Sequence, residues 1–98
     1  RNPFTSFVAV EDGKTVGAIM AGHDGYRGFI HHTAVSEKYR NRGIGKKLVD
    51  RALSAIKSEG INKAVLVVYE DNPGGNSFWE KMGFITRPDL IYRDLRIK

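Results

Sequence analysis

The residues Tyr39-Arg40-Asn41-Arg42-Gly43-Ile44-Gly45-Lys46-Lys47-Leu48 join a basic, glycine-containing loop to an amphipathic pattern. Apolar residues recur there at the spacing of one helix face: Ile44, Leu48, Val49, Ala52, Leu53 and Ile56. With Gly60 as a stop, this pattern predicts a helix over residues 45–59. The first turn of a helix carries unpaired backbone N–H groups and the positive end of the helix dipole. Glycines at that turn let a phosphate approach these groups, so the stretch predicts an anion site.

The spacing of the loop excludes the two common nucleotide-binding motifs. A Walker A loop would need a glycine at the position of Arg40, ahead of the Gly45-Lys46 pair. A Rossmann fingerprint would need a third glycine at the position of Leu48. It would also need an acidic residue about 20 positions later, where the sequence has the apolar run 64–68. The phosphate ligand of this loop is therefore of another kind.

The composition indicates one small domain over residues 1–98. The chain has no cysteine, so it has no disulfide framework, thiolate metal site or cysteine nucleophile. This suits a reducing cytoplasm, and no apolar run is long enough for a signal peptide or a membrane span. We therefore expect a cytoplasmic location and no membrane partner. The chain begins Arg1-Asn2-Pro3 without Met, which indicates a start part-way through a longer protein or after a removed segment.

Positive charge is concentrated around the loop. The formal net charge is +5, and residues 37–63 hold eight Lys or Arg against three Asp or Glu. For Arg51 and Lys57, a solvated helix face is the better explanation. The cations at the phosphate end are candidate ligands: Arg40, Arg42, Lys46 and Lys47. A nucleic-acid partner is disfavoured, because such surfaces interleave aromatic and basic residues and this segment has only Tyr39.

Outside the loop, the sequence predicts several strands and a second helix. The expected strands span 6–10, 15–21, 28–35, 63–69, 84–86 and 90–97, and the expected helix spans 76–82. The first two strands form a hairpin around Asp12-Gly13, and the last two form another around Arg87-Pro88-Asp89. The apolar run in 63–69 is typical of a strand covered on both faces, and a right-handed crossover makes it parallel to 28–35. The predicted class is α/β (α+β), a mixed, mostly antiparallel sheet with a central parallel βαβ unit.

Two motifs carry a family resemblance. The pattern Arg40-x-x-Gly43-x-Gly45, between a strand and a helix, resembles the acetyl-CoA pyrophosphate loop of GNAT-type N-acetyltransferases. Asn72-Pro73, followed at the family's spacing by Phe78-Trp79-Glu80-Lys81-Met82-Gly83-Phe84, resembles the end of the GNAT domain. The resemblance runs from about Phe7 to the C-terminus and implies the GNAT acyl-CoA N-acyltransferase fold. The family's first strand and first two helices are missing, so the fold is expected to be N-terminally shortened.

The resemblance implies roles for residues of the loop and of strand 28–35. Backbone N–H groups would bind the pyrophosphate of acetyl-CoA at Arg42, Gly43, Ile44, Gly45 and Lys46. The Arg40 side chain, with Lys46 or Lys47, would add charge against the phosphates. Ala34 and Val35 would offer backbone hydrogen bonds to pantetheine, and the Val35 N–H would stabilise the oxyanion of the tetrahedral transition state. Asn72 would contact the pantetheine amides, with an Asn-Pro turn before a helix as the equal alternative.

The sequence departs from the family at the residue that protonates the leaving thiolate. The family has Tyr where this chain has Trp79, whose indole N–H is a poor proton donor. General acid catalysis contributes roughly 10² to 10⁴ in rate. A thiol of the Cys type has a pKa of about 8.5 and can leave largely as thiolate near neutral pH. Trp79 therefore indicates a slower enzyme, another donor such as Tyr69 or water, or no enzyme.

An amine acceptor must lose a proton before it attacks. His31 and His32 lie on the strand beside the thioester, and because adjacent strand residues face opposite ways, we expect only one of them in the pocket. His31 matches the position of a histidine in some family members and is preferred. A strand histidine satisfied by a neighbouring hydrogen bond is at least as good an explanation. Glu70, Glu37 and a water chain are remoter candidates for the base.

These features predict an N-acetyltransferase that moves the acetyl group of acetyl-CoA directly to a primary amine. The acceptor would be a small molecule or the N-terminus or lysine of a protein, and no metal is needed. The alternative is a catalytically weak acyl-CoA-binding or regulatory domain. The missing front segment predicts poorly covered apolar surface near strand 28–35. We therefore expect either self-association as a homodimer or the docking of a segment that is absent from this chain.

Overall fold

The computed structural model describes residues 5–97. The chain forms two compact units, one that ends at Val67 and one that begins at Val68. The single domain over 1–98 stays a prediction. Among residues 5–97, no helix is both long enough and apolar enough to cross a membrane.

The first unit holds a four-stranded sheet. Its strands are β1 (Phe7–Glu11), β2 (Lys14–His23), β3 (Gly28–Val35) and β4 (Ala64–Val65), in that order across the sheet. The first three pair antiparallel, and β3 pairs parallel with β4. Asp12 and Gly13 form the first turn with φ of +50° and +77°, the left-handed conformations of a tight hairpin. The predicted mixed sheet and Asp-Gly hairpin are therefore confirmed.

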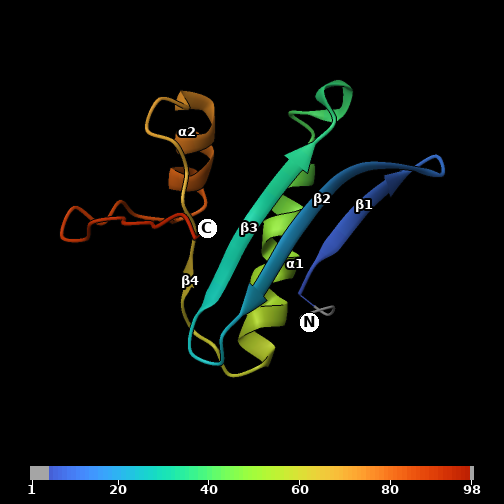
Figure 1. Cartoon of the computed structure of the whole chain (residues 1–98). Helices are drawn as coiled ribbons and strands as arrows, with labels where there is room; N and C mark the ends of the chain where they lie inside the picture. Colours follow the sequence, from blue (N-terminus) through green and yellow to red (C-terminus); the bar gives the residue numbers. More distant parts are fainter. Residues whose placement is uncertain (1–4, 98) are drawn as a thin grey trace. The chain divides into compact units, whose positions relative to one another are not determined.

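One helix covers one face of this sheet (Figure 1). Helix α1 (Ile44–Ser58) buries Leu48, Val49, Ala52 and Ile56, and the buried β-strand residues include Ile19 and Ile30. This is the predicted apolar stripe, with bounds one residue earlier than expected. Gly28 permits close packing here, because a Cβ atom at this position would lie 2.8 Å from Ile56 Cδ1. A short 3₁₀ helix, η1 (Glu37–Tyr39), leads from β3 to the loop.

The predicted strand over 63–69 is much shorter than expected. Only Ala64 and Val65 pair with β3, opposite Gly28 and Phe29. The expectation that this strand is covered on both faces is wrong, since Val67 is 76% exposed. An apolar run thus predicted the strand but not where its pairing ends.

The second unit contains helix α2 (Pro73–Lys81), which begins three residues earlier than predicted because Asn72 caps it. The Asn72 Oδ1 atom accepts the Gly75 N–H at 3.0 Å. The predicted closing hairpin is wrong: residues 84–97 contain a turn, with Leu90 N–H donating to Arg87 O, but no strand. Their alternating apolar residues have no strand ladder within this described part of the chain, and Ile91 and Leu95 are exposed.

Candidate functional site

The loop before α1 leaves backbone donors free for a ligand. Asn41 and Gly43 have φ of +65° and +79°, and α1 begins at Ile44 with Gly43 as its N-cap. The first helical hydrogen bond runs from Lys47 N–H to Gly43 O, at 3.0 Å. Within residues 5–97, no side chain caps this end, so the N–H groups of Ile44, Gly45 and Lys46 lack helical partners. This geometry suits an anion.

Gly43 is needed for its backbone conformation. A Cβ atom there would meet nothing within 4 Å, but φ of +79° is a conformation that L side chains rarely adopt. The surrounding space is open, so bulk alone does not explain the glycine. The glycine instead lets the chain turn into the helix with its N–H groups outward.

The four candidate cations of the loop have different partners. Arg40 Nε donates to Val35 O at 3.1 Å, and Lys46 Nζ lies 2.9 Å from Asp50 Oδ2. Arg42 Nη1 lies 3.5 Å from Glu11 Oε2, and Arg42 Cζ lies 5.0 Å from the Tyr39 ring centre. Lys47 has no acidic partner among the residues that the structure describes. The loop therefore gathers positive charge, part of which already faces carboxylates.

The register of β3 directs the Val35 N–H away from β2. Ser36 N–H donates to Val16 O at 2.7 Å, and successive N–H groups along a strand point to opposite edges. The Val35 N–H therefore points to the edge that faces β4, but β4 pairs only with Gly28 and Phe29. In the described part of the chain, the last part of β3 has no strand on this edge. The oxyanion role of the Val35 N–H stays a prediction. Ala34 lies on the same strand and is exposed.

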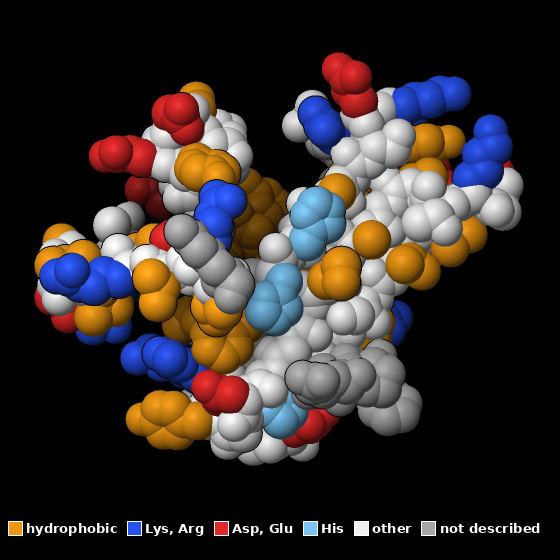
Figure 2. All heavy atoms as spheres, viewed as in Figure 1, with side chains coloured by type: hydrophobic (Ala, Val, Ile, Leu, Met, Phe, Trp, Pro, Cys, Tyr) orange, Lys and Arg blue, Asp and Glu red, His pale blue; other side chains and the backbone are white. Residues whose placement is uncertain are grey.

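Both histidines of β3 lie on the sheet face opposite α1, so the premise that these neighbours face opposite ways is wrong. Which of them faces the acceptor stays a prediction. The pairing steps from Met20–His32 to Ala21–Ile30, which makes His31 the extra residue of a β-bulge. The His31 ring stacks on Phe29 with centroids 6.0 Å apart. His32 lies opposite Met20, whose side chain is exposed, whereas Ile30 is buried. Figure 2 shows histidine side chains beside hydrophobic ones on this face.

The two remaining predicted site residues lie in the second unit. Asn72 is exposed and caps α2, which supports its architectural explanation. Trp79 is half-buried and makes edge-to-face contacts with Phe78 and Phe84, at centroid distances of 4.9 and 5.2 Å. The indole therefore packs an aromatic cluster. Their contact with acetyl-CoA stays a prediction.

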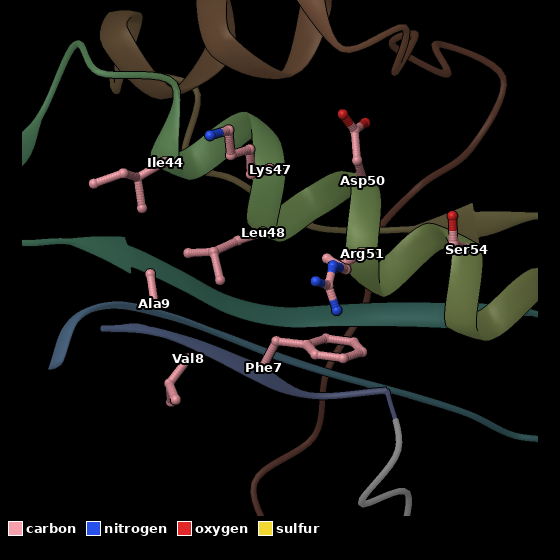
Figure 3. A pocket seen from close by; sticks show the side chains of 9 residues that line it. All are labelled: Phe7, Val8, Ala9, Ile44, Lys47, Leu48, Asp50, Arg51 and Ser54. Atoms are coloured by element: carbon pink, nitrogen blue, oxygen red, sulfur yellow. The ribbon is translucent and has the colours of Figure 1, made fainter. Parts of the chain in front are cut away.

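A groove separates β1 from α1 (Figure 3). Its lining residues are Phe7, Val8, Ala9, Ile44, Lys47, Leu48, Asp50, Arg51 and Ser54. Leu48 and Arg51 point from the helix toward β1, whereas Asp50 and Ser54 point away (Figure 3). The groove contains neither histidine, so we assign no chemistry to it. Sequence reasoning missed the contact of Glu11 with Arg42, because no local pattern links a hairpin to a distant loop.

Comparisons with known proteins agree with this arrangement. The model of the acetyltransferase (GNAT) family matches residues 1–84. N-alpha-acetyltransferase 30 of Schizosaccharomyces pombe is 34% identical over 96 residues, which cover 93% of this chain and 63% of the relative. An acetyltransferase of Sodalis glossinidius is 36% identical over 96 residues, which cover 98% of this chain and 68% of the relative.

A solved structure is similar as well. The crystal structure of the NatC complex bound to Gag peptide and CoA contains a chain that matches with a TM-score of 0.79 and 30% identity. The match covers 85% of this chain and 58% of that one. The chain spans less than two thirds of the length of the first curated relative. On the family model and these relatives together, the chain belongs to the GNAT acetyltransferase family.

Proposed function

We propose that this chain carries an N-acetyltransferase activity that moves the acetyl group of acetyl-CoA directly to a primary amine. The observation that carries the proposal is made on residues 5–97: the start of α1 is uncapped, and the Val35 N–H has no strand partner at the open edge of β3. Two similar proteins support it by what their names state. One is an N-alpha-acetyltransferase, and the other was crystallised with CoA and a peptide.

The residues of the loop fit the pyrophosphate of acetyl-CoA. Its negative charge would meet the N–H groups of Arg42 to Lys46 and the positive end of α1. The Lys47 ammonium has no acidic partner in residues 5–97 and is the cation most available to a phosphate. Arg40 is held on Val35 O, so it fixes the end of β3 as well as adding charge.

The reaction follows from the groups on β3. An amine nitrogen attacks the thioester carbonyl, and the carbonyl oxygen takes negative charge that the Val35 N–H stabilises. Collapse of the tetrahedral intermediate forms the amide, breaks the C–S bond and releases the CoA thiolate. Before the attack, the ammonium form of the acceptor gives one proton to a base. The second proton, which the nitrogen loses on becoming an amide, goes to the departing thiolate or to water. His31 or His32 is the base in this proposal, and both are exposed on one face of the sheet.

The leaving thiolate needs no strong acid, because a thiol of pKa about 8.5 leaves largely ionised near neutral pH. We assign Trp79 a packing role on the strength of its contacts with Phe78 and Phe84. Asn72 remains a candidate for the pantetheine amides through its Nδ2 group, since its Oδ1 caps α2.

A thiol-release assay with acetyl-CoA and a panel of amines tests the activity. The panel should include peptide N-termini, lysine side chains and aminoglycosides. Turnover with any of these amines, together with calorimetric binding of acetyl-CoA, supports the enzyme. The second candidate function, an acyl-CoA-binding or regulatory domain, is favoured by Trp79 and predicts binding without thiol release.

We further propose that the protein acts in the cytoplasm, on the sequence ground that it has no cysteine. The proposed chemistry needs neither a metal nor a nucleic acid. A homodimer is proposed on the exposed apolar side chains of the sheet face that carries Met20 and Val8.

A further inference from the structure

Glu11 reaches the phosphate loop from another part of the chain. It is the last residue of β1, and its Oε2 atom lies 3.5 Å from Arg42 Nη1. The same guanidinium lies over the Tyr39 ring, 5.0 Å from the ring centre. The Arg42 side chain therefore has two neighbours that already occupy it, one of them negatively charged.

The hairpin places the backbone of Glu11 close to the loop. Glu11 pairs with Lys14 across the tight turn of Asp12 and Gly13, whose φ values are both positive. The Lys46–Asp50 pair differs, because its members lie four residues apart on one helix. The Glu11–Arg42 pair instead joins the β1–β2 hairpin to the loop, and it places a negative charge beside the site where an anion would bind.

We propose that Glu11 is a positioning residue that competes with the phosphates of CoA for Arg42, and so weakens CoA retention and speeds CoA release. This inference rests on the proposed function. A phosphate drawn to Arg42 must share the guanidinium with the carboxylate and is repelled by its charge. The Arg42 and Glu11 side chains are 54% and 46% exposed. Exposed pairs of this kind change an equilibrium by factors of about 1.4 to 5, so Arg42 is held weakly enough to exchange partners.

The competition has a kinetic consequence. Acetyl-CoA and CoA carry the same phosphates, so Glu11 weakens the substrate and the product alike. Product release limits the turnover of many enzymes. In an enzyme limited by CoA release, a counter-charge that shortens the residence of CoA raises turnover when acetyl-CoA is abundant.

The test compares E11Q with the parent chain, using D12N as the matched control. Both variants remove one negative charge from the same hairpin tip, and Asn tolerates the left-handed conformation of residue 12. Calorimetry should give E11Q a Kd for CoA about two- to five-fold lower than that of the parent, with slower dissociation by stopped flow. D12N should change both values less. Higher salt should shrink the difference, because both groups are exposed.

A second background shows whether the effect passes through Arg42. In R42A, adding E11Q should change the Kd no more than adding D12N does. The inference is overturned if E11Q binds CoA no more tightly than the parent does. It is also overturned if E11Q raises the CoA affinity of R42A by as much as it raises that of the parent. Inorganic pyrophosphate separates this inference from the proposed function. If the parent does not bind CoA but E11Q binds pyrophosphate more tightly than the parent, the proposed function and the effect on CoA release both fail, and only the competition of Glu11 with a phosphate ligand for Arg42 stands. If neither chain binds either compound, both are overturned.

Discussion

Gly43 occupies a loop position whose backbone conformation favours glycine. A Cβ atom at Gly43 would meet nothing within 4 Å, so a side chain would fit. The φ of +79° is the obstacle, because an L residue in this conformation costs roughly 1–2 kcal/mol. We predict that G43A weakens CoA binding by up to about tenfold, or lowers stability by a similar free energy. G43N is the matched control, because Asn tolerates positive φ. Calorimetry and thermal unfolding measure both effects, and equal affinity and stability of G43A and the parent would contradict the assignment.

His31 and His32 differ in their surroundings although they share one face. His31 stacks on Phe29, and His32 lies opposite Met20. We predict that replacing the base with Gln lowers the rate by roughly 10² to 10⁴ while CoA binding is unchanged. Because a base must be unprotonated to accept a proton, the rate at limiting amine should rise with pH in the parent. Replacing whichever histidine is the base with Gln should flatten this rise.

The two single variants act as controls for each other. If only H31Q flattens the pH–rate profile, His31 is the base, and if only H32Q does, the role belongs to His32. Profiles that are unchanged in both variants and in the double variant would move the proton to water or to Glu37.

Variants of Asn72, the N-cap of α2, test whether this residue also contacts CoA. Its Oδ1 accepts the Gly75 N–H, and loss of such a cap typically costs about 1 kcal/mol. N72A should therefore lower the free energy of unfolding by about that amount. N72D keeps a good cap but removes the amide donors, so we predict full stability with weaker CoA binding. Unaltered CoA affinity in N72D would leave Asn72 a purely architectural residue.

The turn after β2 depends on a carboxylate. Asp24 Oδ1 accepts the N–H groups of Tyr26 and Arg27, each at 2.9 Å. The Arg27 and Tyr26 amides lower the pKa of Asp24 below its ordinary 3.8. Because the folded pKa is lowered, the stabilisation is present above pH 3.8 and is lost as the pH falls through the folded value. We predict faster hydrogen exchange of the Tyr26 and Arg27 amides in D24A, with D24N closer to the parent.

At the scale of elements, the strongest predictions came from dense local patterns. The stripe from Ile44 to Ile56 predicted α1 because one face of a helix repeats within a few residues, and Asp12-Gly13 predicted the hairpin. The bulge at His31 could not be predicted, because it depends on how β3 pairs with β2. The register also decides where the Val35 N–H points, so the sequence predicted which residues form the candidate site but not the directions in which they point.

At the scale of the whole molecule, the alternation of apolar and polar residues gave a wrong strand prediction where the described chain has no partner strand. Residues 84–97 alternate like strands, but a strand also needs a ladder of hydrogen bonds, and none forms within this described segment. The exposed apolar side chains there include Ile91 and Leu95, and those on β1 and β2 include Val8 and Met20.

The last prediction concerns those exposed side chains on β1 and β2. Monomeric proteins rarely leave large contiguous apolar surfaces in water. The sheet face opposite α1 carries Val8, Val10 and Met20, which are 61%, 60% and 57% exposed. We predict that this chain self-associates through that face, with a light-scattering mass that rises above 11.0 kDa at high micromolar concentration.

Single changes on the face separate this contact from others. M20K should shift the association to higher concentration by placing a charge in the contact, whereas S54K, at an exposed position of α1 on the other side of the sheet, is the matched control for added charge. Met20 is 57% exposed and lies outside the core, whereas its neighbour Ile19 is 1% exposed under α1. The M20K change therefore leaves the core intact and should keep the parent's unfolding temperature within a few degrees. A parent chain that stays at monomer mass throughout would contradict the dimer, and equal association of M20K and the parent would place the contact elsewhere.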